Sequence, residues 1–476
     1  MSQIRTIFKN MSWLLVSQIV GSAFGFIWTI LLARYLGVND YGIFGFAVSF
    51  TTIVGIIDDL GISTHIVRHI STDYDSAPKY LGNALPLKLI FSSFKVILTV
   101  IILIIQGVNE FTLTITLLFT LEMIFKSYVS LLNGSFQAFE YGKYQGIGNT
   151  VLSTLTLTFI IISIYTDLGL VGVGISYISA NVITFAYEYY ALNKHVTQPK
   201  FELDTTFCKK ITLLSIPFAV TAILSNIYYS IDMVMLSHIV GDYPTGIYNA
   251  TYKLISVLTV FYSVYIAVIF PVMSKLFEKD ESMLLVSFEK SIKYLLMVII
   301  PLAVATVFYS TDIIHLIYGH EYDAASSVLC ILIWTVCLLF ISGACNTLLN
   351  ASHKELTVTK IYAIAAAFNI VLNFFMIPYL SYDGAAITTV LSDLLIVTIQ
   401  AYVIYRLGHR PNKKLYVDIV KIILGSCVLG IALYILNINM WLAIPVGIII
   451  YLCAIYLLKF FDNDDKFVIK EILGKN

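Results

Sequence analysis

Three lysines stand inside long apolar stretches of this sequence, where an ionisable side chain is costly. They are Lys95, Lys126 and Lys253. A charged group at the middle of a bilayer costs about 2.5–3.5 kcal/mol on insertion scales, so such a residue usually faces a cavity or a partner. An amine in such a place can hold phosphate oxygens through charge-assisted hydrogen bonds. The positions therefore favour binding of an anionic group within a membrane.

Two arginines extend this set toward the ends of the apolar stretches. Arg34 follows the first stretch and Arg68 follows the second. With the three lysines they make a hypothetical cationic track across the membrane, with Arg68 at its cytoplasmic mouth. An arginine at a helix end is also a common interfacial anchor. Lys95 has no acidic residue at helical spacing, so snorkelling and an unseen partner are its alternatives to a substrate contact.

Three intramembrane carboxylates are candidates for coupling to an ion gradient: Glu122, Asp232 and Asp393. A membrane carboxylate that takes up H⁺ or binds Na⁺ can link a change of conformation to the gradient. Glu122 stands four residues before Lys126 on the same helix face, so a self-neutralising pair is the alternative there. For Asp232 the alternative is an ion pair with Lys253.

The composition indicates which class of protein contains these charged groups. Of the 476 residues, 59% are hydrophobic and 12% are charged, and the mean hydropathy is +0.87. Soluble domains are about 45–50% apolar, so this is an integral membrane protein. A net charge of zero argues against nucleic acid as a partner, because binding to it needs a concentrated basic surface. The six cysteines show no CxxC spacing, so we expect neither disulfides nor a zinc site.

Apolar runs of sufficient length recur along the whole chain. A helix needs about 20 mostly apolar residues to cross the hydrocarbon core. We expect fourteen such helices, near residues 11–33, 42–61, 83–105, 111–133, 146–165, 170–192, 211–237, 246–270, 291–309, 326–349, 359–377, 384–405, 418–436 and 440–460.

Lysine and arginine test this count, because cytoplasmic loops retain positive charge during insertion. Nearly all of the 29 basic residues lie in the N-terminus, the even-numbered gaps and their flanks, or the C-terminal tail. The exceptions are Arg34, Lys95, Lys126 and Lys253. Both termini should therefore face the cytoplasm, and the number of spans should be even. Asp58 and Asp59 fall at the cytoplasmic end of the second span, where we expect solvation to be cheap.

A corner of the chain is written twice. LLARYLGVNDYGIFGF at 31–46 recurs as MLSHIVGDYPTGIYNA at 235–250. LLNGS at 131–135 likewise matches LLNAS at 348–352, and the stretch from Gly172 aligns with that from Gly384 without a gap. The matches keep one order and a nearly constant offset, which indicates two copies of a six-helix unit.

The repeat predicts the architecture. We expect an all-α membrane protein with an N-terminal lobe at 1–193, a C-terminal lobe at 194–410, and two further helices with a cytoplasmic tail at 411–476. Each lobe has an even number of crossings, so both insert the same way up. A pseudo-two-fold axis along the membrane normal then relates them, as in parallel-repeat transporters. Two such lobes can expose a central cleft to each side in turn.

Four stretches carry a family resemblance. They are LLARYLGVNDYGIF, DLGISTHIVRHIS at 59–71, IDMVMLSHIVGDYPTGIYNATYKL at 231–254 and STDIIHLIYGHEYDAASSVLCIL at 310–332. With them the chain resembles the polysaccharide (O-antigen and repeat-unit) flippases of the multidrug/oligosaccharidyl-lipid/polysaccharide exporter superfamily, whose fold is MATE-like. The resemblance implies a cell-membrane flippase that carries a polyprenyl-diphosphate-linked oligosaccharide to the outer leaflet. It leaves open coupling to H⁺ or Na⁺ and contact with polysaccharide polymerase or glycosyltransferase machinery.

Three other functions remain to be weighed. A multidrug antiporter of the same superfamily typically has an acidic residue in its first helix, and residues 11–33 contain none. A lipid II flippase should carry more arginine in its first lobe. A membrane enzyme needs a large extramembrane loop or an acidic catalytic cluster, and the sequence shows neither. His65 and His69 have metal-ligand spacing but no third ligand, so we expect no metal and no cofactor.

Overall fold

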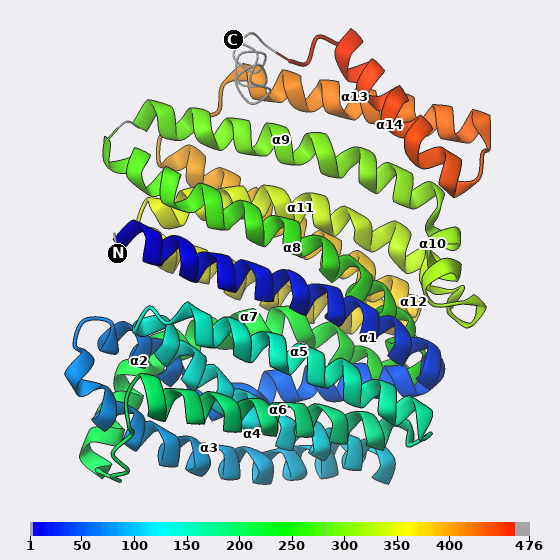
Figure 1. Cartoon of the computed structure of the whole chain (residues 1–476). Helices are drawn as coiled ribbons and strands as arrows, with labels where there is room; N and C mark the ends of the chain where they lie inside the picture. Colours follow the sequence, from blue (N-terminus) through cyan, green and yellow to red (C-terminus); the bar gives the residue numbers. More distant parts are fainter. Residues whose placement is uncertain (1–2, 280, 462–476) are drawn as a thin grey trace. The chain divides into compact units, whose positions relative to one another are not determined.

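The computed structural model describes residues 3–279 and 281–461, and within these ranges the chain forms helices and no β-strand (Figure 1). The elements in chain order are α1 (Gln3–Val54), the 3₁₀ turn η1 (Gly55–Asp58), α2 (Ile62–Ile70), η2 (Tyr74–Ser76), α3 (Ala77–Gln106), α4 (Glu110–Ala138), α5 (Gly142–Tyr165), α6 (Gly169–His195), α7 (Thr205–Val240), α8 (Asp242–Lys279), α9 (Glu281–Phe308), α10 (Ser310–Ile317), η3 (His320–Tyr322), α11 (Ala325–Ala351), α12 (Glu355–Arg406), α13 (Lys413–Leu436) and α14 (Met440–Leu457).

Two of these helices are each long enough to cross a bilayer twice. α1 and α12 have 52 residues each, or about 78 Å of helix against a hydrocarbon core of about 30 Å. Each is broken by one non-helical residue, Gly37 in α1 and Ser381 in α12. Among the described residues, 11 stretches are long and apolar enough to span a membrane. The all-α multi-pass fold is confirmed, and the count of fourteen crossings stays a prediction.

The helices divide into two compact units. Unit 1 contains Met1–Ala250 and Asn373–Tyr382, and unit 2 contains Thr251–Leu372 and Asp383–Asn476. Within unit 1, α6 packs against α4 and α5, and α1 packs against α5 and α7 (Figure 1). Within unit 2, α9 packs against α11 and α13, and α13 packs against α14. The lobe boundaries at residues 193 and 410 stay a prediction.

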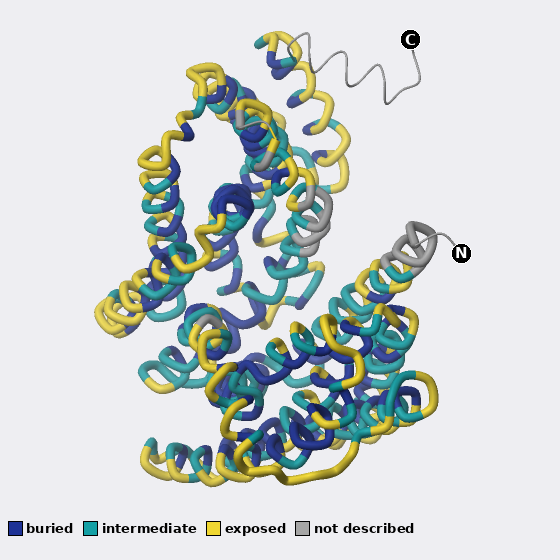
Figure 2. Tube along the Cα trace, turned by 90° about the vertical axis from the view of Figure 1, so that its left-hand side faces the viewer, coloured by how far each residue is buried: buried dark blue, intermediate teal, exposed yellow. Residues whose placement is uncertain are grey.

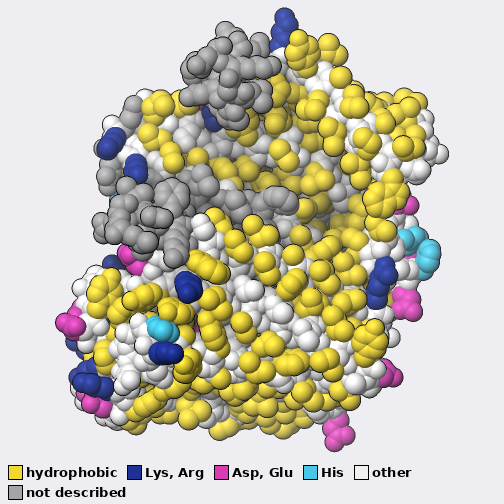
Figure 3. Space-filling model, in the orientation of Figure 1, with side chains coloured by type: hydrophobic (Ala, Val, Ile, Leu, Met, Phe, Trp, Pro, Cys, Tyr) yellow, Lys and Arg dark blue, Asp and Glu magenta, His cyan; other side chains and the backbone are white. Residues whose placement is uncertain are grey.

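Both units expose apolar side chains as a membrane protein must. The helices carry exposed residues along their outer faces (Figure 2), and many of these are large hydrophobics, such as Ile104, Ile105, Phe374, Tyr434 and Ile435. Hydrophobic side chains cover much of the face in Figure 3, while most of its Lys, Arg, Asp and Glu side chains lie at the margins. Apolar patches of this extent mark a surface covered by lipid or protein.

The two copies of the repeated corner pack directly on each other within unit 1. A Cβ added to Gly42 would collide with the backbone carbonyl of Asp242, and one added to Gly246 would collide with the carbonyl of Val38. Val38 and Asp242 occupy equivalent positions of the repeat, as do Gly42 and Gly246. Each copy thus makes the same contact with the other, which is the pattern that a two-fold relation produces.

The corner keeps the same backbone shape in both copies. Gly37 has φ 69° and its counterpart Gly241 has φ 96°, a region that side chains with a Cβ rarely adopt. One further bond joins the copies, because the Asn249 side-chain amide donates to the Tyr41 carbonyl at 3.2 Å. The sequence repeats this corner, and the repeated glycines allow two backbones to cross in contact.

Candidate functional site

A sharp bend after α1 positions two carboxylates in the interior of unit 1. The 3₁₀ turn η1 ends at Asp58, and the chain then passes through Leu60 with φ 41° and Gly61 with φ 76°. A Cβ on Gly61 would lie 2.6 Å from the Ser215 carbonyl oxygen of α7. Only glycine therefore fits both the conformation and the space. The bend turns Asp58 and Asp59 toward α3 and α4.

The first of these carboxylates forms a buried ion pair. The Lys95 Nζ lies 2.5 Å from Asp58 Oδ2, and both side chains are 1% exposed. Lys95 also donates to the Thr120 carbonyl of α4 at 3.1 Å. Cheap solvation of Asp58 was therefore a wrong expectation, because the bend packs it between helices. Lys95 finds its partner on another element rather than at helical spacing.

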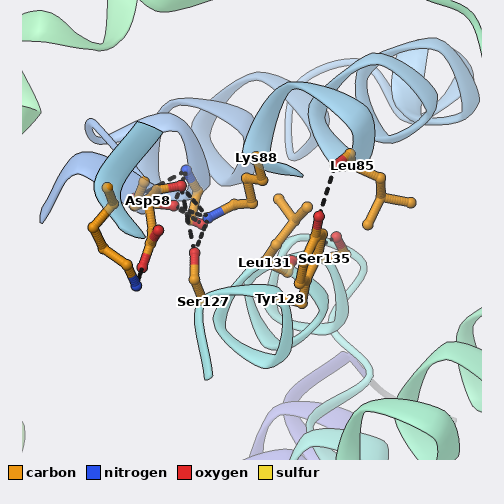
Figure 4. A network of polar contacts seen from close by, with 10 residues as sticks. Asp58, Leu85, Lys88, Ser127, Tyr128, Leu131 and Ser135 are labelled. Carbon is orange, nitrogen blue, oxygen red and sulfur yellow. Dashed lines mark hydrogen bonds and ion pairs between the residues drawn. The ribbon is translucent and has the colours of Figure 1, made fainter. Parts of the chain in front are cut away.

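A second buried pair lies beside the first. The Lys88 ammonium is fully buried and pairs with Asp59. It also donates to Ser127 Oγ of α4 at 2.7 Å and points toward the Asp58 carbonyl (Figure 4). The Tyr128 hydroxyl next to it donates to the Leu85 carbonyl at 3.1 Å. These bonds fasten the bend, α3 and α4 to one another through polar groups.

Lys88 was not among the predicted site residues, because it lies close to a cytoplasmic gap and was counted with the basic residues that flank such gaps. A signal was nevertheless present. Lys88 and Lys95 are seven residues apart, which places them two turns apart on one face of α3. Two adjacent carboxylates, Asp58 and Asp59, precede them at the end of the preceding span. Two amines on one face and two neighbouring acids predict a paired network.

The network brings two ammonium groups and two carboxylates together in the interior of unit 1. Each lysine ammonium has three donors, and the desolvation cost of a buried pair offsets most of its Coulombic gain. Asp58 Oδ1 is buried and accepts no hydrogen bond from any described residue.

The predicted pair of Glu122 and Lys126 lies on α4, close to this network. Glu122 is buried and accepts a hydrogen bond from the Asn181 amide of α6 at 3.0 Å. Lys126 is exposed, and both Lys126 and Lys95 act electrostatically on the Glu122 carboxylate. Unit 1 thus brings Lys95, Lys126 and Glu122 into one charged region, together with Lys88.

The other predicted cations are spread over three helices. Arg34 is exposed on α1, Arg68 is exposed on α2, and Lys253 is half-buried on α8. Lys253 belongs to unit 2, whereas the remaining four belong to unit 1. The cationic track as a whole therefore stays a prediction.

The other two predicted coupling carboxylates, Asp232 and Asp393, are buried like Glu122. Asp232 of α7 accepts hydrogen bonds from the Tyr248 hydroxyl at 2.8 Å and from the Asn373 amide at 2.6 Å, all within unit 1. Asp393 lies on α12 in unit 2 and is 7% exposed. Their role in coupling stays a prediction.

A further buried acid of unit 1 escaped the sequence analysis. Glu188 of α6 is fully buried against Gly148 of α5, and both carboxylate oxygens lack a hydrogen bond of standard geometry from the described residues. The side chain of Asn133 on α4 is the polar group that acts on it. An unpaired carboxylate is expensive to bury in its charged form, so Glu188 differs in kind from the paired carboxylates Asp58 and Asp59.

His65 and His69 of α2 are the two histidines with metal-ligand spacing. The His65 and His69 rings lie 6.3 Å apart. Burial lowers the pKa of His65, and the nearby His69 and Arg68 lower it further. These effects favour the neutral form of the His65 imidazole.

The described chain forms a many-helix membrane fold with a duplicated corner and charged groups in its interior, and comparison with known proteins identifies the family. The family model described as polysaccharide biosynthesis protein matches residues 7–277, and the MatE model matches residues 217–375. This chain belongs to the polysaccharide biosynthesis protein family. It is a flippase or transporter of the multidrug/oligosaccharidyl-lipid/polysaccharide exporter superfamily, and not an enzyme.

Relatives come from archaea and bacteria. The chain is 23% identical to the probable low-salt glycan biosynthesis flippase Agl15 of Haloferax volcanii, over 80% of this chain and 79% of the relative. It is 24% identical to the capsular polysaccharide biosynthesis protein CapF of Staphylococcus aureus, over 84% and 99%. An uncharacterized membrane protein of Methanocaldococcus jannaschii, MJ1068, is also 24% identical, over 85% and 86%.

Solved structures share the fold. An inward closed conformation of the lipid II flippase MurJ superposes with a TM-score of 0.78 at 17% identity, over 93% of this chain and 97% of that chain. An inward-facing multidrug transporter of the MATE family superposes with a TM-score of 0.69 at 16% identity, over 82% and 95%. The MATE-like fold that the family resemblance implies is confirmed.

Proposed function

We propose that this protein carries a polyprenyl-diphosphate-linked oligosaccharide from the cytoplasmic to the outer leaflet of the cell membrane by alternating access. The observation that carries the proposal is the family match over residues 7–277. Two relatives covering four-fifths or more of this chain support it, since one is named as a glycan biosynthesis flippase and the other as a capsular polysaccharide protein. Both termini of the chain face the cytoplasm in this proposal.

The diphosphate is the part of the substrate that the charged region of unit 1 suits. In the proposed cycle its oxygens displace Asp58 and Asp59 from Lys95 and Lys88. Each ammonium then keeps a charged partner, and the released Asp58 and Asp59 carboxylates must take up a proton or reach water, because an unpaired buried charge is costly. Lys126, Arg34, Arg68 and Lys253 complete the proposed cationic route for the headgroup. Membrane lipids occupy the exposed apolar faces.

An ion gradient supplies the driving force in this proposal. Asp232, Asp393 and Glu122 are the candidate sites for H⁺ or Na⁺, because each is a carboxylate largely withdrawn from solvent. An ion that binds one conformation more tightly than the other shifts the equilibrium between them. Contact with a polysaccharide polymerase or a glycosyltransferase is a further part of the proposal.

Two other substrates have a specific observation in their favour. The likeness to the lipid II flippase MurJ favours a peptidoglycan precursor, which has the same prenyl diphosphate anchor as our proposed substrate. The MatE match at 217–375 favours a cationic drug. A cation would be repelled by amines released from their carboxylates, so we rank it last.

Transport by the purified full-length protein distinguishes these substrates. Proteoliposomes receive a fluorescent prenyl-diphosphate oligosaccharide, fluorescent lipid II or a cationic dye, and a membrane-impermeant quencher reports the movement of each. We expect flipping of the oligosaccharide lipid and its loss in Lys95→Met, with Lys79→Met as the exposed-lysine control. Flipping of lipid II alone, or movement of the dye alone, would replace our proposal with the corresponding alternative. Imposed H⁺ and Na⁺ gradients test the coupling in the same assay.

A further inference from the structure

Three metal-ligating side chains meet in the connection between α10 and α11 of unit 2. They are His315, His320 and Asp323, and one ligand atom from each lies within 4.8 Å of the other two. His315 Nε2 contacts Asp323 Oδ1, and His320 Nδ1 lies 3.8 Å from the same oxygen. The two imidazole rings have their centroids 4.1 Å apart. The charged network of unit 1 plays no part in this cluster.

The backbone of the connection holds these side chains on one side. α10 ends at Ile317, and Gly319 turns the chain with φ 91° before the single turn of η3. Tyr318 and Tyr322 point inward and are buried, with their rings 5.3 Å apart. The two tyrosines anchor the turn, so the residues between and beside them face outward.

We propose that His315, His320 and Asp323 form a binding site for a first-row divalent cation of the zinc class. Zn²⁺ prefers imidazole nitrogen and carboxylate oxygen at about 2.0–2.2 Å, which puts tetrahedral ligand atoms about 3.3 Å apart. The contact between His315 and Asp323 is shorter than this value, and the separation between His320 and Asp323 is longer. Small side-chain rotations would therefore complete the shell. Three protein ligands leave a fourth position for water, as in open zinc sites. Magnesium and calcium are excluded as preferred ions because they favour all-oxygen shells.

A bound ion would join the end of α10 to the start of α11. His315 belongs to the last turn of α10, and Asp323 stands two residues before Ala325, where α11 begins. By the charge sorting of the loops, this connection lies on the outer side of the membrane, where it meets extracellular metal. The site is independent of the proposed transport, since it shares no residue with it.

Metal titration of the full-length protein in detergent tests this proposal. The protein is purified without a polyhistidine tag and treated with a chelator. ZnCl₂ is then added in competition with a chromophoric zinc indicator. We expect one site per chain in the wild type and at least tenfold weaker binding in His320→Ala and in Asp323→Asn. Elution at an unchanged volume in size-exclusion chromatography shows that these exposed positions leave the fold intact.

The chain offers a matched control. His353 and Glu355 form an exposed histidine–carboxylate contact of 4.0 Å on another loop, and His353→Ala should leave the zinc affinity unchanged. Zinc should also raise the unfolding temperature of the wild type and leave that of His320→Ala unchanged, because ligand binding stabilises the folded state. Equal affinity in wild type and His320→Ala, or loss of the site in His353→Ala, would overturn the proposal. Neither result depends on whether the protein flips a lipid.

Discussion

Lys88 and Lys95 of α3 each form a buried ion pair. Each is withdrawn from solvent and neutralised by one carboxylate of the bend, Asp58 for Lys95 and Asp59 for Lys88. A buried ion pair adds little net stability, but removing one member strands the other. The intact network therefore adds little to the free energy of unfolding, but substitution of one member lowers that free energy strongly. In the proposed transport cycle these groups change partners.

Asp58→Asn should destabilise the protein strongly because it leaves the Lys95 ammonium buried without its counter-ion. We expect a loss of about 3–5 kcal/mol in the free energy of unfolding. Adding Lys95→Met to it should restore most of that loss, since the double variant strands no charge. Thermal unfolding in detergent measures both effects, with a thiol-reactive dye that reports exposure of the buried Cys208, Cys337 and Cys345.

Glu188→Gln is the matched control for that prediction. It also removes a buried carboxylate of unit 1, but one with no cationic partner, so no charge is left behind. Its effect on the free energy of unfolding should be much smaller than that of Asp58→Asn. Equal losses from the two substitutions would mean that burial alone, and not pairing with Lys95, determines the cost.

At the scale of helices, the packing at the repeated corner tolerates little change. The first half of α1 ends at Gly37, α7 ends at Val240, and the segments that follow cross at Gly42 and Gly246. The crossing is close because neither residue has a side chain. Helix-forming ability alone would favour alanine at both places.

Gly42→Ala and Gly246→Ala should each destabilise the protein through collision with the backbone of the other copy. Overpacking of this kind costs about 1–3 kcal/mol, and the equivalent positions should give similar losses. Gly25→Ala is the control, because its Cβ would meet nothing closer than 3.8 Å within α1. Unfolding temperatures of the three variants decide the matter. A loss at only one of the two crossing glycines would argue against an equivalent contact.

At the scale of the whole molecule, the sorting of basic residues predicts which ends of the helices face the cytoplasm. Tyr74, between the bend and α3, should lie inside, and Tyr165, at the end of α5, should lie outside. Both side chains are exposed, at 50% and 87%. Burial therefore does not limit their labelling.

Cysteine labelling in intact cells tests this topology. The exposed Cys427 and Cys453 are first replaced by serine, and Tyr74→Cys or Tyr165→Cys is added. A membrane-impermeant maleimide should label only the Tyr165→Cys variant until the cells are permeabilised. Labelling of Tyr74→Cys in intact cells would reverse the orientation, and with it the expected location of both termini and the outer position of the proposed metal site.

Much of the element-level structure could be predicted from the sequence. Each predicted span corresponds to a described helix or half of a kinked one, because the cost of burying polar groups in lipid acts along each segment separately. The kink at Gly37 and the second corner at Gly241 were also visible as a repeat. The glycine contacts between the copies were not, since a repeat does not state which of its positions touch.

The charged residues of the candidate site could be singled out from the sequence, but their pairing could not. Lys95, Lys126 and Glu122 could be singled out because a charge in an apolar run stands out in one dimension. Their partners could not, since Asp58 lies on a different element from Lys95 and Lys88 resembled a cytoplasmic flank. The sequence alone determined a membrane transporter built from a duplicated set of helices, because hydropathy and charge sorting are properties of segments. Only the tertiary structure decided which charges neutralise each other, because that depends on how the bend after α1 turns two carboxylates onto the lysine face of α3.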